Sequence, residues 1–164
     1  MSSSVRLAAR ADAPAISAVY DHHVLHSVAT FDVVPPSATD RLLWLAQHPG
    51  GRHRALVVEL DGAVVGFASS SPFRPRAAYD TTVESSVYLA PHAVGRGLGR
   101  ALYAELFDRL AGEDVHRVLA VVAQPNPASE ALHRSFGFQQ VGTFTEAGRK
   151  FGRFVDIAWF ERAL

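Results

Sequence analysis

A glycine-rich turn joined to a leucine-patterned helix constrains this chain more than any other feature of its sequence. Gly95, Gly97 and Gly99 alternate with other residues, and the four leucines from Leu98 to Leu110 repeat every four positions. This spacing predicts an amphipathic helix of about three to four turns with one buried face. Because residues 82–89 have the pattern of a strand, the glycines lie where a strand passes into a helix.

The glycine turn has the properties of a phosphate-binding loop. Its backbone N–H groups lie at the positive end of a helix dipole, and Arg96 and Arg100 add positive charge. The same residues also fit a tight turn before a solvated helix. The dinucleotide-binding fingerprint is excluded because it needs glycine at Arg100. A P-loop is excluded because the only lysine, Lys150, lies far from these glycines.

The remaining patterns predict a mixed sheet covered by helices. Strands are expected at residues 5–8, 54–60, 63–70, 82–89, 115–123, 138–144 and 151–160. Further helices are expected to begin after Asp12, after Ser37, which opens a capping-box pattern, and after Asn126. The dipeptide Asp61-Gly62 predicts a tight hairpin between two of the strands. Hairpins and strand-helix-strand units in one chain imply a mixed sheet with helices on its faces.

Composition limits the partners and the chemistry. Sixteen Lys and Arg balance sixteen Asp and Glu, so no excess of positive charge favours a nucleic acid or a membrane surface. The absence of cysteine excludes disulfides, thiolate metal ligands and a cysteine nucleophile. His22 and His26 lack the carboxylate of a metal-binding pattern, so no metal site is expected. Without a linker, repeat, leader or long apolar run, we expect one domain over residues 1–164, located in the cytoplasm.

Three polar side chains are candidates for chemistry, and each also has an ordinary structural explanation. Glu84 shares one face of its expected strand with Ser86 and Tyr88. It is either a general base or an ordinary solvated side chain. Asn126 lies between an expected strand and an expected helix. It either binds a ligand or only caps the helix. His133 lies on the same expected helix. It is either a general acid or an ordinary histidine on the helix surface or partly buried.

These segments, in this order, resemble the Gcn5-related N-acetyltransferases, the GNAT superfamily that uses acetyl-CoA. The match is sharpest with the phosphinothricin and methionine sulfoximine acetyltransferase branch, and it covers nearly the whole chain. The matching segments are residues 24–32, 79–88, 125–129, 132–133, 136–138 and 148–153. The resemblance implies the GNAT fold, an α/β (α+β) architecture whose mixed, mostly antiparallel central sheet has about six to seven strands and helices on both faces. It also implies a homodimer, which the aromatic residues Phe154, Trp159 and Phe160 favour unless they fill the core.

The resemblance implies direct transfer of acetyl from acetyl-CoA to the amino group of a small amino acid or analogue, such as phosphinothricin, methionine sulfoximine or methionine sulfone. Glu84 would take the amine proton, the Leu89 N–H would stabilise the carbonyl oxygen, and His133 would protonate the CoA thiolate. Val94 stands where the family usually has Gln or Arg, but a loop that binds through backbone N–H groups tolerates this change. The residues expected to bind acetyl-CoA are Val87, Tyr88, Leu89, Val94, Gly95, Arg96, Gly97, Leu98, Gly99, Arg100, Asn126 and Ser129.

The expected acceptor site includes two arginines just ahead of the Glu84 strand. Arg74 and Arg76 lie in a proline-rich loop, where guanidinium groups either bind a carboxylate or phosphinate or remain solvated. The resemblance adds Phe31 and Tyr79 to this site. Two alternatives remain open, namely acetylation of a peptide N-terminus or a polyamine, and a CoA-binding module without catalysis.

Overall fold

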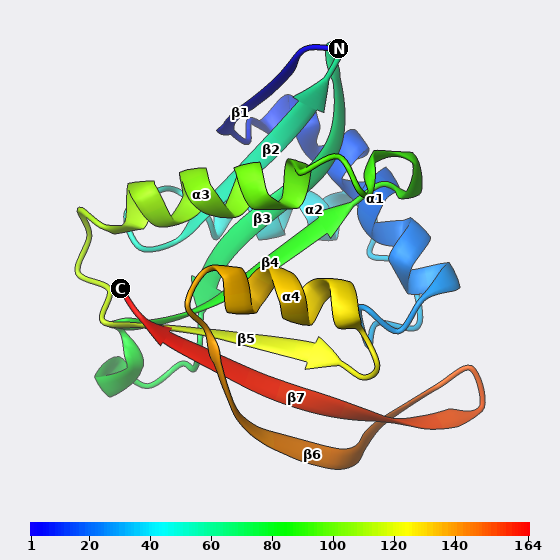
Figure 1. The fold of residues 1–164 in the computed structure, drawn as a ribbon. Helices are drawn as coiled ribbons and strands as arrows, with labels where there is room; N and C mark the ends of the chain where they lie inside the picture. The colour runs from blue at the N-terminus through cyan, green and yellow to red at the C-terminus, as the bar shows by residue number, and fades with distance from the viewer.

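The computed structural model describes residues 1–164 and contains a seven-stranded sheet with helices on both faces (Figure 1). The strands are β1 (Ser3–Leu7), β2 (Arg54–Leu60), β3 (Ala63–Pro72), β4 (Thr82–Leu89), β5 (Arg117–Ala123), β6 (Gln139–Lys150) and β7 (Arg153–Ala163). Their spatial order is β1-β2-β3-β4-β5-β7-β6, and only the β4–β5 pair is parallel. The expected mixed, mostly antiparallel sheet is therefore confirmed.

Four helices cover the sheet, two on each face. They are α1 (Ala13–His26), α2 (Ala38–Ala46), α3 (Leu98–Leu110) and α4 (Pro127–Ser135). In Figure 1, α3 and α4 lie in front of the sheet and α2 lies behind it. The leucines of α3 that repeat every four residues are buried, with Leu102, Leu106 and Leu110 fully excluded from solvent. Burial of this stripe confirms the amphipathic pattern and fixes α3 against β2 and β3.

Local sequence signals place the helix and hairpin ends where they were predicted. Ser37 and Asp40 form a reciprocal capping box at the start of α2, with hydrogen bonds of 2.9 and 3.1 Å. Asn126 caps α4 by accepting a hydrogen bond from the Ser129 N–H at 3.1 Å. Asp61 and Gly62 adopt positive φ angles of 50° and 85° in the β2–β3 hairpin.

The C-terminal hairpin differs from the predicted boundaries. The expected end of a strand at residue 144 is wrong, because β6 continues to Lys150 and β7 begins at Arg153. The turn is made by Phe151 and Gly152, which have positive φ angles of 52° and 73°. Register shifts between Phe144 and Gly148 interrupt the alternation, so the sequence pattern ends before the pairing does.

The parallel β4–β5 pair is short, and its early end creates the site. The two strands pair only over residues 82–84 and 117–119 and then diverge, as the ribbon shows (Figure 1). Beyond this point the edge of β4 that faces β5 has no strand partner. Backbone groups at the end of β4 are therefore available to a ligand.

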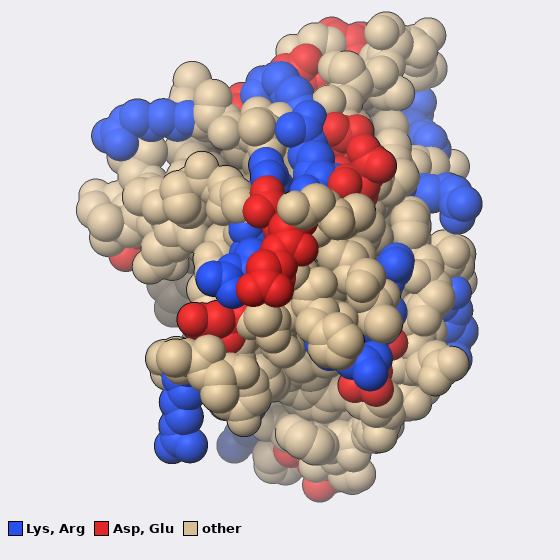
Figure 2. Space-filling model, turned by 90° about the vertical axis from the view of Figure 1, so that its left-hand side faces the viewer, with Lys and Arg blue, Asp and Glu red and all other residues tan.

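Charged side chains of opposite sign are mixed on the face that Figure 2 shows. Lys and Arg side chains lie next to Asp and Glu side chains there, with no continuous basic area across that face. Arg6 forms ion pairs with both Asp12 and Glu59, at 2.7 and 2.6 Å. None of the helices has the length and apolar character needed to cross a membrane.

Candidate active site

A cleft opens where β4 and β5 diverge, and most residues predicted to bind acetyl-CoA line it. It has a volume of about 490 Å³ and extends between the first turns of α3 and α4. His133 also lines the cleft. Arg96 does not line it, because its guanidinium turns away and donates to the His92 carbonyl at 3.2 Å. The predicted residues that do are Val87, Tyr88, Leu89, Val94, Gly95, Gly97, Leu98, Gly99, Arg100, Asn126 and Ser129.

The glycine turn carries a row of unused backbone donors at the edge of this cleft. None of the amide N–H groups of residues 95–100 donates a hydrogen bond within the protein. Gly95 and Gly97 have positive φ angles of 77° and 76°, and a Cβ atom at either would meet open space. Free N–H groups at a helix N-terminus attract anions, and glycine lets a ligand approach the backbone closely. The turn therefore fits the pyrophosphate of acetyl-CoA.

The end of β4 adds one more backbone donor. The Ala90 N–H donates a hydrogen bond to the Val65 carbonyl of β3. Because hydrogen-bonded and non-hydrogen-bonded pairs alternate along antiparallel strands, the N–H and C=O of Leu89 point away from β3. His23 Nε2 lies 2.8 Å from the Leu89 carbonyl oxygen, and since a carbonyl only accepts, Nε2 carries the hydrogen. With the carbonyl used by His23, the Leu89 N–H remains on the cleft side of the strand.

His133 is buried at the cleft with both ring nitrogens engaged. Nδ1 lies 2.7 Å from the Ser129 carbonyl and carries the hydrogen, because a carbonyl only accepts. Burial lowers the pKa of His133, which keeps the ring neutral, so Nε2 accepts from the Tyr103 hydroxyl at 3.0 Å. In this arrangement His133 itself offers no N–H to a ligand, and the polar group beside it is Tyr103.

His23 and Tyr103 were not predicted as site residues. His23 lies near the end of α1, 66 positions before the Leu89 carbonyl that it contacts. Tyr103 follows the buried Leu102 in α3, so its position in the sequence indicates only another core residue. No local pattern marks either residue, because each contact depends on how a helix packs against the sheet.

Glu84 lies on the sheet face that carries α1 and α2. It shares this face with Ser86 and Tyr88, as predicted from strand alternation. The side chain is half-buried, and burial raises the pKa of its carboxyl above the ordinary value, while the positive charge of Arg74 opposes this rise. A carboxylate with a raised pKa is suited to accept a proton near neutral pH.

A second pocket, of about 260 Å³, lies on the same face as Glu84. Ser86 and Tyr88 line both this pocket and the cleft, so these residues of β4 border both hollows. Ser71 also lines the pocket, and it is the cross-strand partner of Glu84 on β3. The pocket therefore reaches from residues that also border the cleft to the cross-strand neighbour of Glu84.

Three of the residues predicted for the acceptor lie in the loop before β4. Phe73 connects two of them, because the Arg74 guanidinium lies 5.0 Å from its ring centre and Tyr79 meets it edge-on at 5.4 Å. Arg76 is exposed and forms no ion pair within the chain. Arg74 is thus placed to act on Glu84, and Arg76 is free to meet a charged ligand.

Phe31, the fourth predicted acceptor residue, is held by the β6–β7 hairpin. Its ring packs directly against Gly148, where an added Cβ would overlap the ring atoms. Lys150 is buried, and its ammonium donates to the Thr30 carbonyl at 2.8 Å and to the His23 carbonyl at 3.3 Å. These contacts join the segment after α1 to the hairpin, although the two are far apart in sequence.

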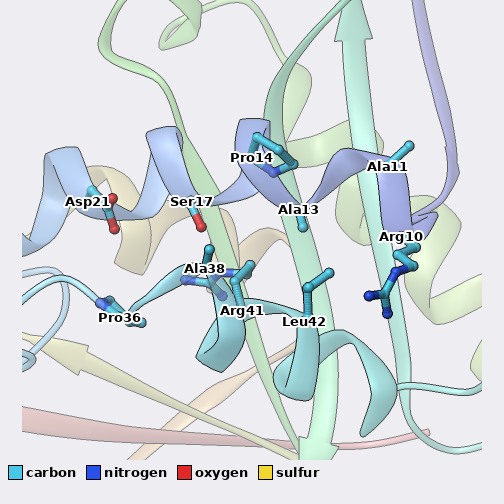
Figure 3. Close-up of a pocket in the computed structure, with 10 residues that line it drawn as sticks. All are labelled: Arg10, Ala11, Ala13, Pro14, Ser17, Asp21, Pro36, Ala38, Arg41 and Leu42. Carbon is cyan, nitrogen blue, oxygen red and sulfur yellow. The ribbon is translucent and has the colours of Figure 1, made fainter.

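A third hollow, of about 770 Å³, lies between α1 and α2 and contains no predicted site residue (Figure 3). The Arg41 side chain extends from α2 into the space beside Ser17 of α1. Arg41 is buried, and its guanidinium carbon lies 4.9 Å from the ring centre of Tyr20 and 5.0 Å from that of Trp44. Arg41 also lines the second pocket, so it borders both hollows.

Proteins named as N-acetyltransferases are similar to this chain in sequence and in fold. The phosphinothricin N-acetyltransferase of Streptomyces coelicolor is 48% identical over 163 residues, which cover 98% of this chain and 95% of that protein. A sequence model of the Acetyltransferase (GNAT) family matches residues 19–138. The chain belongs to this family.

Two further relatives agree with this membership. The L-methionine sulfoximine/L-methionine sulfone acetyltransferase of Salmonella typhimurium is 35% identical, over 98% of this chain and 94% of that protein. The crystal structure of a phosphinothricin acetyltransferase from Sinorhizobium meliloti in complex with acetyl-CoA superposes with a TM-score of 0.95 and 38% identity. It covers 100% of this chain and 89% of that one. The predicted GNAT fold and the acetyltransferase class are thereby confirmed, and the roles of single residues stay predictions.

Proposed function

We propose that this acetyltransferase moves an acetyl group from acetyl-CoA to the amino group of a small amino acid or analogue, of the phosphinothricin or methionine sulfoximine type. This proposal rests on one point of β4, where Ser86 and Tyr88 border both hollows. An acetyl thioester in the donor-lined cleft and an amine beside Glu84 would face each other across this point. The names of the relatives support the acceptor class.

The cleft supplies separate groups for the pyrophosphate and for the pantetheine arm of acetyl-CoA. The amides of residues 95–100 donate to the pyrophosphate, and Arg100 adds positive charge. Asn126 uses its side-chain oxygen to cap α4, so its amide nitrogen is free to donate to the pantetheine arm. When bound, acetyl-CoA supplies an acetyl group already activated as a thioester.

Glu84 and the Leu89 N–H act on the reacting atoms. The acceptor attacks as the neutral amine, through its lone pair, and Glu84 takes one of its protons as the N–C bond forms. The Leu89 N–H donates to the carbonyl oxygen as negative charge develops there. The C–S bond then breaks, and the sulfur leaves as a thiolate that takes up a proton. The absence of cysteine agrees with direct transfer, because no acyl-cysteine can form.

In this proposal the group that stabilises the departing sulfur is Tyr103 and not His133, because both ring nitrogens of His133 are already engaged. Burial raises the pKa of Tyr103, so its hydroxyl keeps its hydrogen at neutral pH. In the structure this O–H points to His133 Nε2. By turning from Nε2 to the departing sulfur, the hydroxyl would stabilise the thiolate with a hydrogen bond until solvent supplies the proton.

The position of Arg74 leads to a prediction about pH dependence. The base form of Glu84 is lost as the pH falls through its pKa, which sets the acid limb of kcat/KM for the amine. Arg74→Ala removes the positive charge that lowers this pKa, so the limb is expected to move to higher pH. Arg76→Ala is the matched control, because Arg76 has no such influence on Glu84. Identical limbs in the parent and Arg74→Ala would contradict the assignment of Glu84 as base.

Acceptor identity is tested by release of free CoA from acetyl-CoA with a panel of amines. We expect turnover with methionine sulfoximine, methionine sulfone or phosphinothricin and little with short peptides or spermidine. If Arg76 binds the acid group, Arg76→Ala lowers kcat/KM about 10- to 100-fold, the size of a lost charge-assisted hydrogen bond. Amidation of the substrate carboxylate should cost the parent a similar factor, and the two losses should not add. A parent enzyme that prefers peptides or polyamines would refute the proposed acceptor class.

The surface of the β6–β7 hairpin supports a homodimer as part of this proposal. Phe160 is buried, so it belongs to the core, but Phe154 is 61% exposed. Phe144 and Val141 on the edge strand β6 are 58% and 56% exposed. A long edge strand with exposed apolar side chains is a surface that pairing with a second copy would cover.

A further inference from the structure

One histidine outside the predicted site fixes the direction of a hydrogen bond beside Glu84. His48 follows the last turn of α2, and its Nδ1 lies 2.7 Å from the Trp44 carbonyl. Its Nε2 lies 2.8 Å from the Ser71 hydroxyl oxygen. A carbonyl oxygen can only accept, so Nδ1 carries the ring hydrogen of neutral His48. Nε2 must then accept, and the Ser71 O–H donates to it.

The neutral form of His48 is favoured by its surroundings. Burial lowers its pKa, and the nearby charges of His53 and Arg41 lower it further, while the Trp44 carbonyl acts in the opposite direction. The Ser71 hydrogen is thus committed to His48 at neutral pH. The two lone pairs of the Ser71 oxygen are left as the only groups that this hydroxyl offers to a ligand.

Ser71 lies in the right place for an amine to use these lone pairs. It is the cross-strand partner of Glu84, and both side chains stand on the same face of the sheet. It also lines the second pocket, which shares Ser86 and Tyr88 with the cleft. An amine nitrogen that gives one hydrogen to Glu84 and another to Ser71 has its remaining direction, the lone pair, free for the acetyl carbon.

We propose that the Ser71 hydroxyl, oriented by His48, accepts a hydrogen bond from the acceptor amine next to Glu84. Ser71 is then a further binding residue of the reaction, and His48 is a positioning residue that acts through it. This inference rests on the proposed function. It adds that two hydrogen-bond acceptors align the amine: the charged carboxylate of Glu84 on β4 and the neutral hydroxyl of Ser71 on β3.

The first test compares Ser71→Ala with Ser71→Thr in steady-state assays with methionine sulfoximine, or with whichever acceptor of the panel the parent acetylates. Ser71→Ala is expected to lower kcat/KM for the amine about tenfold or more, with KM for acetyl-CoA unchanged. Ser71→Thr keeps a hydroxyl that can donate to His48, so it should recover kcat/KM to within about threefold of the parent. Equal kcat/KM in Ser71→Ala and a parent of proven activity would overturn the inference.

The second test separates positioning from folding. His48→Phe removes the acceptor at Nε2 and frees the Ser71 hydroxyl to rotate, so a smaller loss in kcat/KM is expected than for Ser71→Ala. When His48→Phe and Ser71→Ala are combined, their losses in kcat/KM should not add, because His48 acts only through Ser71. Fully additive losses would refute the positioning role.

A third measurement does not depend on turnover. The ¹⁵N chemical shifts of the His48 ring in the full-length parent should show hydrogen on Nδ1 and a free lone pair on Nε2 at neutral pH. The opposite tautomer would overturn the inference even if the enzyme is active. If the parent acetylates no amine of the panel, the proposed function fails, and this measurement still decides the orientation of Ser71.

Discussion

Glu84→Gln is expected to lower kcat by about 10²- to 10⁴-fold while the Kd for acetyl-CoA stays close to that of the parent. Glutamine has nearly the same shape but cannot take the amine proton. Glu84 does not line the cofactor cleft, so its loss should spare cofactor binding. The measurements are turnover with a saturating acceptor at neutral pH and acetyl-CoA titration of the same preparation.

Glu161→Gln provides a matched control for this variant. Glu161 of β7 pairs with Leu119 of β5, which in turn pairs with Glu84, so both carboxyls stand on one face and in one row of the sheet. The same chemical change at Glu161 should leave kcat within about twofold. A folded Glu84→Gln enzyme with full turnover would show that water or another residue is the base.

Gly97→Val is expected to weaken acetyl-CoA binding by about 10- to 100-fold or more, the cost of at least one lost charge-assisted hydrogen bond. A Cβ at Gly97 meets no protein atom, so the added side chain would fill the space proposed for the pyrophosphate. A calorimetric titration with acetyl-CoA measures the change in Kd directly.

The positive φ of Gly97 adds backbone strain to any substitution there, and a control must carry the same strain. Gly152 has a φ of 73° against 76° for Gly97, and a Cβ at Gly152 also meets open space. Gly152 lies at the tip of the β6–β7 hairpin, away from the cleft. Gly152→Val should therefore lose stability but keep the parent Kd for acetyl-CoA. Equal weakening of binding in both variants would mean that strain, not a blocked phosphate site, explains Gly97→Val.

Much of the fold could be predicted because its signals are local. The leucine period of α3, the capping box at Ser37 and the Asp61-Gly62 turn each depend only on residues close together in the sequence. The end of β6 could not be predicted, because pairing with β7 extends this strand through residues that have no strand pattern. Backbone hydrogen bonds to a neighbouring strand decided its length.

The candidate site divides in the same way. Gly95 to Arg100 could be named from the sequence because a phosphate turn is built from consecutive amides and a helix start. Glu84 could be assigned to the correct face because strand alternation is a local property. The resemblance to one acetyltransferase branch supplied the chemistry for these residues, and family membership is now confirmed.

The sequence by itself thus determined the fold class, the family and the glycine turn. Only the tertiary structure decided which groups complete the site: His23 on the Leu89 carbonyl, Tyr103 on His133, and His48 on Ser71. These partners are 66, 30 and 23 positions apart in the chain. Each pair joins a helix or the residues just after one to another element, and such contacts are set by packing and strand register. They also fix which nitrogen of each histidine carries hydrogen, because a tautomer depends on the partner that folding supplies.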